Sequence, residues 1–282
     1  MRARLYVVAF GCLWPVYALY WAWGEKGASG AELVLNAVIA GYFLFLLRWD
    51  IVPWYARVAC LAAVIVAAER GWGALGVGVA VAALAGIWYW LWRPPSAEGA
   101  DMKFPLGAGS YFVVQGGRSS LTNHHASAAP QRYALDIVKL NWAGARAAGL
   151  YPGRLASYAI FGDVVSSPCD GVVARAVDGL PDLCPGVHDP FQPGGNHVVI
   201  RSEDGRIDVK LSHLMRGSVL VRGGDRVRSG QELARVGNSG NTSEPHLHVH
   251  AVRRCGGEGG GEALPLRFGK RWLTRNSIVR IY

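Results

Sequence analysis

Three histidines alternate with apolar residues in the segment EPHLHVH, residues 244–250. In an extended strand successive side chains point to opposite faces, so His246, His248 and His250 share one face and the two apolar residues between them share the other. Imidazole nitrogens bind metal ions and transfer protons near neutral pH. The spacing therefore predicts a strand with a polar face suited to metal or acid–base chemistry and an apolar face turned to a core.

Zinc is the metal that this residue set favours. A catalytic zinc ion takes three protein ligands, usually imidazole or carboxylate groups, and keeps a fourth position for water. All eight histidines of the chain lie within residues 100–282. Spacing alone does not select among the candidate ligands outside the HLHVH strand, which are Asp136, His124, His125, His188, His197 and His213.

Four segments together resemble the LytM-type zinc endopeptidases of the M23 family, which include lysostaphin-like enzymes that cut peptide cross-links in peptidoglycan. The segments are SPCDGVV (167–173), GNHVVI (195–200), VKLSHL (209–214) and GNSGNTSEPHLHVH (237–250). The resemblance covers about residues 105–255, and its specific feature is an HxH strand after a G-x-S-G turn. It implies a zinc-dependent endopeptidase that hydrolyses peptidoglycan peptides with a zinc-activated water.

The resemblance also implies a role for individual residues. His248, the second histidine of HLH, would be a zinc ligand, and Asp136 in YALD would be a carboxylate ligand. His246 would be the catalytic base beside the metal. His213 would be the second catalytic histidine and would donate to the developing oxyanion.

The third ligand departs from the family pattern. The family usually has a histidine four residues before the aspartate, and this chain has Arg132 there. The pair His124–His125 lies further upstream, so we expect a longer loop between two ligands, with His125 as the ligand and His124 as the alternative. His250 is expected to lie around the site rather than to be a fourth ligand, because a closed site would leave no place for water.

The elements that would position these residues lie in the second half of the chain. Runs rich in Val and Ile, punctuated by Gly, Asp and Pro, predict strands at 164–177, 196–202, 206–214 and 245–253. Residues 142–150 could form a short helix. We expect a mostly antiparallel sheet, in a sandwich or half-barrel, over residues 105–282, preceded by a linker at 94–104.

The first half has a different composition. Residues 1–93 hold nine of the eleven Trp and no His. Apolar stretches at 5–23, 33–47 and 71–92, with a shorter one at 58–68, predict three or four membrane-spanning helices. The expected fold class is therefore α + β, with transmembrane α-helices before the β-rich domain. The expected localisation is the inner or cytoplasmic membrane, multi-pass.

The number of spans decides the side on which the second half lies. The positive-inside bias places Arg2, Arg4, Arg48 and Arg57 in the cytoplasm. Four spans would then put the second half in the cytoplasm, and three spans would put it outside. A wall hydrolase requires the extracytoplasmic side, which favours an odd number of spans.

Charge and cysteine content add expectations about partners. Residues 100–282 carry 22 Lys and Arg against 15 Asp and Glu, which suits an anionic partner such as the cell wall or a membrane surface. No nucleic-acid-binding motif is found, so nucleic acid is not expected. The segment 139–162, rich in Gly, Arg and aromatic residues, is a candidate loop along a substrate groove. Cys169 and Cys184 could form a disulfide in an oxidising compartment or remain free thiols.

Two other functions compete with the hydrolase. Arg132 in the usual ligand position keeps open an inactive M23-like domain that binds cell wall or regulates another hydrolase. The segments DGVV and GDRVRSGQ also resemble turns of biotinyl and lipoyl carrier domains. That carrier alternative lacks the lysine that would hold the prosthetic group, and it does not explain HLHVH.

Overall fold

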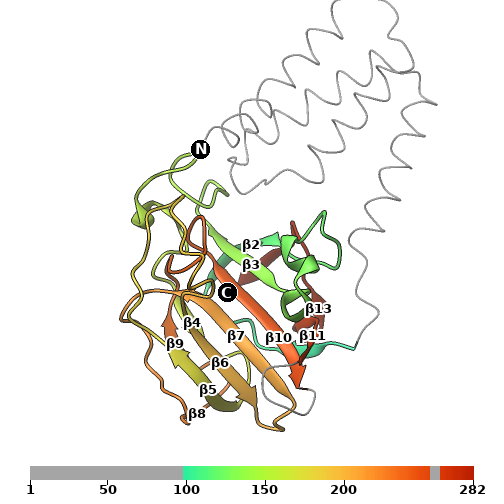
Figure 1. Ribbon diagram of the computed structural model, residues 1–282. Helices are drawn as coiled ribbons and strands as arrows, with labels where there is room; N and C mark the ends of the chain where they lie inside the picture. The colour runs from blue at the N-terminus through green and yellow to red at the C-terminus, as the bar shows by residue number, and fades with distance from the viewer. Residues whose placement is uncertain (1–97, 255–260) are drawn as a thin grey trace, which may run out of the picture. The chain divides into compact units, whose positions relative to one another are not determined.

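The computed structural model describes residues 98–254 and 261–282 (Figure 1). All of them belong to the second of the two units into which the chain divides, Trp92–Tyr282.

A nine-stranded sheet forms the centre of this unit (Figure 1). Its strand order is β14-β2-β3-β10-β7-β6-β5-β8, and β11 pairs with β10 beyond the end of β3. Every pairing in this sheet is antiparallel. In chain order its strands are β2 (Gly109–Gln115), β3 (Leu135–Leu140), β5 (Gly171–Val177), β6 (Asn196–Ser202), β7 (Ile207–Leu214), β8 (Arg226–Val227), β10 (Leu247–Arg254), β11 (Gly261–Leu264) and β14 (Ile278–Ile281).

Two small sheets and three short 3-10 helices complete the described residues. One sheet joins β4 (Val164–Ser166) to β9 (Glu232–Arg235). The other has the order β1 (Ala100–Met102), β12 (Leu266–Phe268), β13 (Arg271–Trp272), with β1 and β12 parallel. The helices are η3 (His124–Ser127), η4 (Ala129–Gln131) and η5 (Leu155–Ser157).

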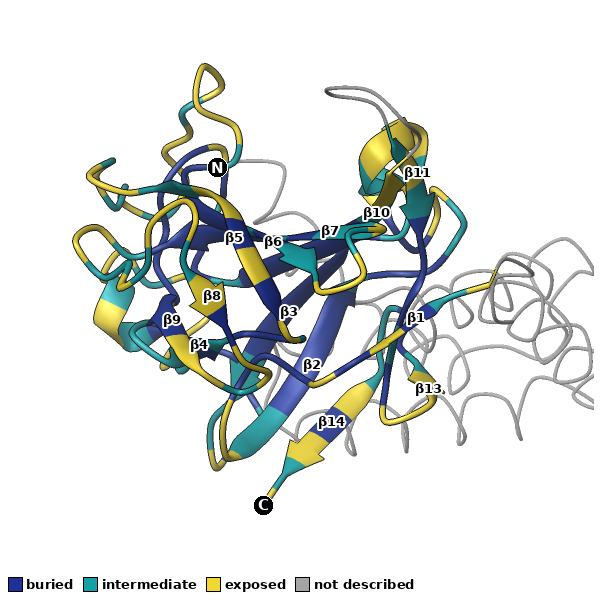
Figure 2. Cartoon of the chain, turned by 90° about the horizontal axis from the view of Figure 1, so that it is seen from below, coloured by how far each residue is buried: buried dark blue, intermediate teal, exposed yellow. Residues whose placement is uncertain are grey.

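The core lies on one face of the large sheet. The apolar residues of the alternating strands point toward this face. Leu247, Val249 and Leu211 are fully buried there. Figure 2 shows the central strands as mostly buried and β8 and β14, at the sheet's ends, as partly exposed. Alternation thus leaves the polar residues of β10 and β7 on the opposite face of the sheet, where the candidate site is built.

The expected α + β class is wrong for this structure. The regular secondary structure of the described residues is almost entirely β-strand, because their sequence contains short Val- and Ile-rich runs between glycine turns. The membrane spans predicted within residues 1–93 lie outside the described residues. Within residues 98–254 and 261–282 no helix is long and apolar enough to cross a membrane. The expected multi-pass membrane localisation is corrected on the same finding.

The β-rich part of the prediction is confirmed. The four predicted runs correspond to β4 and β5, to β6, to β7 and to β10. The short helix at 142–150 is wrong, since this segment is a series of turns. Gly144 and Gly149 adopt positive φ values of 72° and 114°, and the Asn141 side chain accepts hydrogen bonds from two backbone amides that follow it. The predicted linker at 94–104 contains β1.

Candidate metal centre

Two neighbouring strands bring a carboxylate and an imidazole together from distant parts of the sequence. Asp136 on β3 and His248 on β10 are register partners, so their side chains lie side by side on the same face of the sheet. His248 Nδ1 lies 2.9 Å from Asp136 Oδ1. Both residues are buried.

A third donor comes from the loop between β2 and β3. His125 Nε2 lies 3.2 Å and 3.1 Å from the two oxygens of Asp136, and its ring lies 4.6 Å from the His248 ring, centroid to centroid. His124, Asp136 and His125 also bring ligand atoms within 4.8 Å of one another. His125 is half-buried and His124 is exposed. The structure therefore places both histidines of the pair near Asp136, with His125 in direct contact.

The buried side chain of Asn123 fixes this loop. Its Oδ1 accepts from the His125 backbone amide as the N-cap of η3. Its Nδ2 lies within hydrogen-bond distance of three backbone carbonyls, those of Gly117, Arg132 and Ala134. One amide side chain thus ties the segment that carries His125 to the start of β3.

The donor set suits a zinc ion. Ligand atoms of a tetrahedral zinc site lie roughly 3.3 Å apart, which is close to the separations between Asp136 and the two histidines. Burial raises the pKa of Asp136, but His246 and the hydrogen bonds from His125 and His248 outweigh it and hold the pKa well below its usual range. Burial lowers the pKa of His248. An ionised carboxylate and a neutral imidazole are the forms that bind metal.

His246 lies on the same face of β10, next to this group. Its Nε2 is 3.6 Å from Asp136 Oδ1. Its Nδ1 is 2.8 Å from the carbonyl oxygen of Glu244, which can only accept, so Nδ1 carries the hydrogen and donates. The neutral ring therefore keeps a lone pair on Nε2, the atom nearest the carboxylate. That tautomer is the one a general base needs.

His213 reaches the site through an irregularity in β7. Ser212 pairs with His197 and Leu214 pairs with Asn196, which leaves His213 as an extra residue in the strand. Its φ is 63°, an uncommon backbone conformation for a residue other than glycine. Regular alternation would point His213 toward the core, together with Leu211. The bulge re-aims it toward the site, where its ring lies 4.8 Å from the His246 ring.

The surroundings of His213 bear on its chemical role. Its Nδ1 donates to the carbonyl of Ser239 at 2.9 Å. Burial, and then His246 and His248, lower the pKa of His213 well below its usual range, so the ring is neutral at pH 7. A neutral ring with Nδ1–H presents a lone pair at Nε2. This arrangement favours an acceptor at that atom, whereas the resemblance predicted a donor.

The remaining histidines have different environments. His250 Nδ1 lies 2.8 Å from His248 Nε2, on the side of that ring away from Asp136. When His248 Nδ1 binds a metal ion beside Asp136, its Nε2 carries the hydrogen and can donate to His250. His197 is buried on β6 and bonds the carbonyl of Gly195. His188 is exposed in a turn.

Two functional candidates were missed from the sequence. Arg146 and Glu244 form a buried ion pair with an Nη2–Oε2 distance of 2.8 Å, although they are 98 residues apart. Glu244 also supplies the carbonyl that orients His246. The only signal for this pair was a glutamate directly before the PHLHVH run. Lys210 is the second candidate, and the signal was its even spacing from Ser212 on β7, which puts it on the site face.

The segment 139–162, predicted to be a groove loop, lies against the turn that leads into β10. The Tyr151 hydroxyl donates to the carbonyl of Ser243 at 2.7 Å. Trp142 is 92% exposed, so this segment does present an aromatic side chain to solvent. Cys169 and Cys184 are both free, which answers the question of a disulfide between them.

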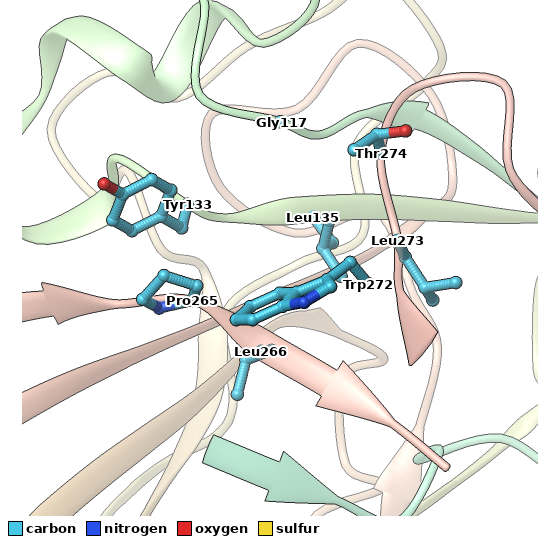
Figure 3. A pocket seen from close by; sticks show the side chains of 8 residues that line it. All are labelled: Gly117, Tyr133, Leu135, Pro265, Leu266, Trp272, Leu273 and Thr274. Carbon is cyan, nitrogen blue, oxygen red and sulfur yellow. The ribbon is translucent and has the colours of Figure 1, made fainter. Parts of the chain in front are cut away.

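A separate small pocket is lined by none of these histidines. Figure 3 shows the rings of Trp272, Pro265 and Tyr133 along its wall. The other lining residues are Gly117, Leu135, Leu266, Leu273 and Thr274. None of the eight is a predicted site residue.

Residues 156–258 match Peptidase family M23, so an M23 peptidase domain lies in this part of the chain. The match includes His213, His246 and His248. Asp136 and His125 lie before it.

Three solved structures are among those similar to this chain. A zinc-containing peptidase from Vibrio cholerae has 28% identity, covers 35% of this chain and has a TM-score of 0.27. Lysostaphin, solved by NMR, has 18% identity, covers 46% of this chain and has a TM-score of 0.30. A putative M23 peptidase from Pseudomonas aeruginosa has 16% identity, covers 61% of this chain and has a TM-score of 0.31. This chain covers 25%, 40% and 54% of the lengths of these three proteins, respectively.

Proposed function

We propose that this chain is a zinc-dependent endopeptidase that hydrolyses the peptide cross-links of peptidoglycan. The observation that carries the proposal is the convergence of Asp136, His248 and His125 from two strands and a capped loop, at contacts of 2.9–3.2 Å. The match to Peptidase family M23 over residues 156–258 supports the same reaction class.

In this proposal Asp136, His248 and His125 hold one zinc ion. The ion would supply a Lewis acid for a peptide carbonyl and lower the pKa of a water molecule toward about 7. One carboxylate and two neutral imidazoles leave a net positive charge, which suits both effects. His250 holds His248 from the far side by accepting from Nε2.

In this proposal His246 transfers a proton and His213 orients the attacking water. His246 accepts a proton from the attacking water at Nε2 and passes it to the leaving amine as the C–N bond breaks. Asp136, 3.6 Å away, stabilises the protonated ring. His213 accepts a hydrogen bond from the same water at Nε2 and so fixes its orientation, while its Nδ1 is held by Ser239. The water thus gives its hydroxyl to the carbonyl carbon and one proton to the amine.

The competing function is an inactive M23-like domain that binds cell wall or regulates another hydrolase. It was kept open by Arg132, which occupies the usual ligand position. Arg132 is exposed, and its backbone carbonyl serves to anchor Asn123. His125 occupies the place beside Asp136 instead, which favours the active enzyme.

Metal analysis and a cleavage assay on the full chain test the proposal together. We expect about one zinc per chain and release of amines from purified peptidoglycan or glycine-rich cross-bridge peptides. Asp136→Asn and His248→Ala should lose both zinc and activity, while His246→Ala should keep zinc and lose activity. His188→Ala, an exposed histidine outside the site, is the matched control. Zinc binding without cleavage of any peptide would favour the inactive alternative.

A further inference from the structure

The face of the sheet that carries the candidate metal centre also carries a row of cations. On this face His248, Ser212 and His197 are register partners across β10, β7 and β6. The next row along the strands contains His250 and Lys210, followed by Val199 and Arg175 on β6 and β5. Because residues two apart share a face, Lys210 lies beside the metal row, about 7 Å along the strand direction.

Lys210 and Arg175 have no acidic partner in the part of the chain that the structure describes. No described carboxylate lies within ion-pair distance of either side chain. The neighbouring row differs, because Arg201 there bonds Asp208 at 3.0 Å. Lys210 is half-buried, and burial together with Arg175 lowers the pKa of its ammonium group. Two cations in one row, with Val199 of β6 between them, repel each other when no anion is present, and a bound anion would relieve that repulsion.

The ammonium group of Lys210 lies near Gly194 and His197. A Cβ placed on Gly194 would be 2.7 Å from Lys210 Nζ and 3.5 Å from His197 Nδ1. The carbonyl of the same Gly194 accepts from the His213 backbone amide at 3.2 Å. Lys210 Nζ therefore lies beside residue 194 and close to His197. Glycine at 194 leaves this ammonium group without a side chain over it.

We propose that Lys210, assisted by Arg175, forms a subsite that binds a carboxylate of the substrate about two residues from the scissile bond. The separation follows from the row spacing of about 7 Å, which equals two residues of extended peptide. The inference rests on the proposed peptidase function and deepens it, because it gives the class of substrate: a peptide with a free carboxylate near the cleaved bond. A C-terminal residue and an acidic side chain both present this group.

A peptide series separates the two sources of carboxylate. The probes share one glycine-rich cross-bridge sequence around the bond expected to be cleaved. One pair differs only in a C-terminal carboxylate against a carboxamide, and a second pair only in Glu against Gln two residues from the bond. We expect wild type to prefer the acid of at least one pair by roughly ten- to a hundredfold in kcat/KM, as hydrogen bonds to charged groups provide. The pair with the larger preference identifies the source.

Variants of Lys210 and Arg175 test whether these two side chains cause the preference for the acid peptide. Lys210→Met should bring the kcat/KM values of acid and amide close to parity, because it removes the cation that binds the acid. Lys210→Arg should keep part of the preference, and Arg175→Met should reduce it. Lys103→Met is the matched control, since it removes the same charge from an exposed lysine that lies against Gly230.

Direct binding keeps this test separate from the test of catalysis. Calorimetry with the acid and amide peptides on the His246→Ala variant measures the subsite even if no peptide is cut. Equal binding of acid and amide, or an acid preference that survives Lys210→Met, would overturn the subsite and leave the peptidase proposal standing. Absence of cleavage together with a Lys210-dependent acid preference would overturn the peptidase and keep the anion site.

Discussion

At the residue scale, the site depends on which nitrogen of each histidine carries its hydrogen. His246 and His213 both direct Nδ1 to a backbone carbonyl, which can only accept. His248 has the opposite arrangement, with Nδ1 toward Asp136 and Nε2 toward His250. The proposed base His246 and its neighbour His213 thus present Nε2 to the site, whereas the proposed ligand His248 presents Nδ1.

The contact between His248 and His250 predicts an effect on metal affinity. His250→Phe removes the acceptor and frees the His248 ring, so we expect the Kd for zinc to rise about 10- to 100-fold. His250→Gln should lose less, because its side-chain oxygen can accept the same hydrogen. Competition with a chromophoric chelator measures the Kd. A His250→Phe protein that binds zinc as tightly as wild type would contradict the orienting role, and His188→Phe controls for loss of a histidine elsewhere.

His197 predicts a pH dependence of stability. Burial lowers its pKa from 6.5 to about 4, despite the hydrogen bond to Gly195. Between those two pH values the unfolded chain binds more protons than the folded one, so stability is full above about pH 6.5 and falls as the pH drops toward 4. The loss attributable to this residue is at most about 3 kcal/mol. Urea unfolding of wild type and His197→Asn across this window measures it, and equal pH slopes in the two proteins would refute it.

At the scale of elements, irregular segments position side chains that regular strands would not bring to the site. The HxH spacing of β10 could be predicted from the sequence because strand alternation has a fixed period. The bulge at His213 could not, since nothing in VKLSHL marks an extra residue in the strand. Likewise, the pairing of β3 with β10, which brings Asp136 to His248, joins segments 112 residues apart. It followed from the resemblance and not from local pattern.

The loop that carries His125 depends on Asn123. We expect Asn123→Ala to weaken zinc binding although it removes no ligand, because both the cap on η3 and the bonds to three carbonyls are lost. The cap alone contributes about 1 kcal/mol. Asn123→Asp keeps the cap acceptor and loses the donors, so it should fall between wild type and Asn123→Ala. Isothermal titration with zinc gives the order, and wild-type affinity in Asn123→Ala would exclude this anchoring role.

The ion pair of Arg146 and Glu244 links the 139–162 loop to the entry of β10. Removing one partner leaves a buried charge, so Arg146→Met and Glu244→Leu should each cost about 3–5 kcal/mol of folding stability. The double variant should cost much less than the sum of the two, since neither charge then remains buried alone. Urea unfolding of the wild type, the two single variants and the double variant measures the four free energies of unfolding that this cycle needs. Additive losses would show that the two side chains do not stabilise each other.

At the scale of the whole unit, the nine-stranded sheet extends well beyond the segment that matches the family. Residues 156–258 contain β5 to β8 and β10 but not β2 and β3. They therefore lack Asp136, and also the strand that covers one edge of β10 in the complete sheet. The sequence indicated that this part of the chain is rich in β-strands. It could not indicate the strand order, because order is set by pairings between distant segments.

Zinc should stabilise this unit as a whole, because its ligands come from separate parts of the sheet and meet only in the folded state. A ligand present at 100 times its Kd adds about 2.7 kcal/mol to the free energy of unfolding. For a unit of this size that corresponds to a rise in Tm of roughly 5–10 °C. We therefore expect a chelator to lower the Tm of the full chain by this amount and added zinc to restore it. Asp136→Asn should unfold at one temperature with or without chelator. A wild-type Tm that changes with neither zinc nor chelator would mean that Asp136, His248 and His125 do not bind a common metal ion.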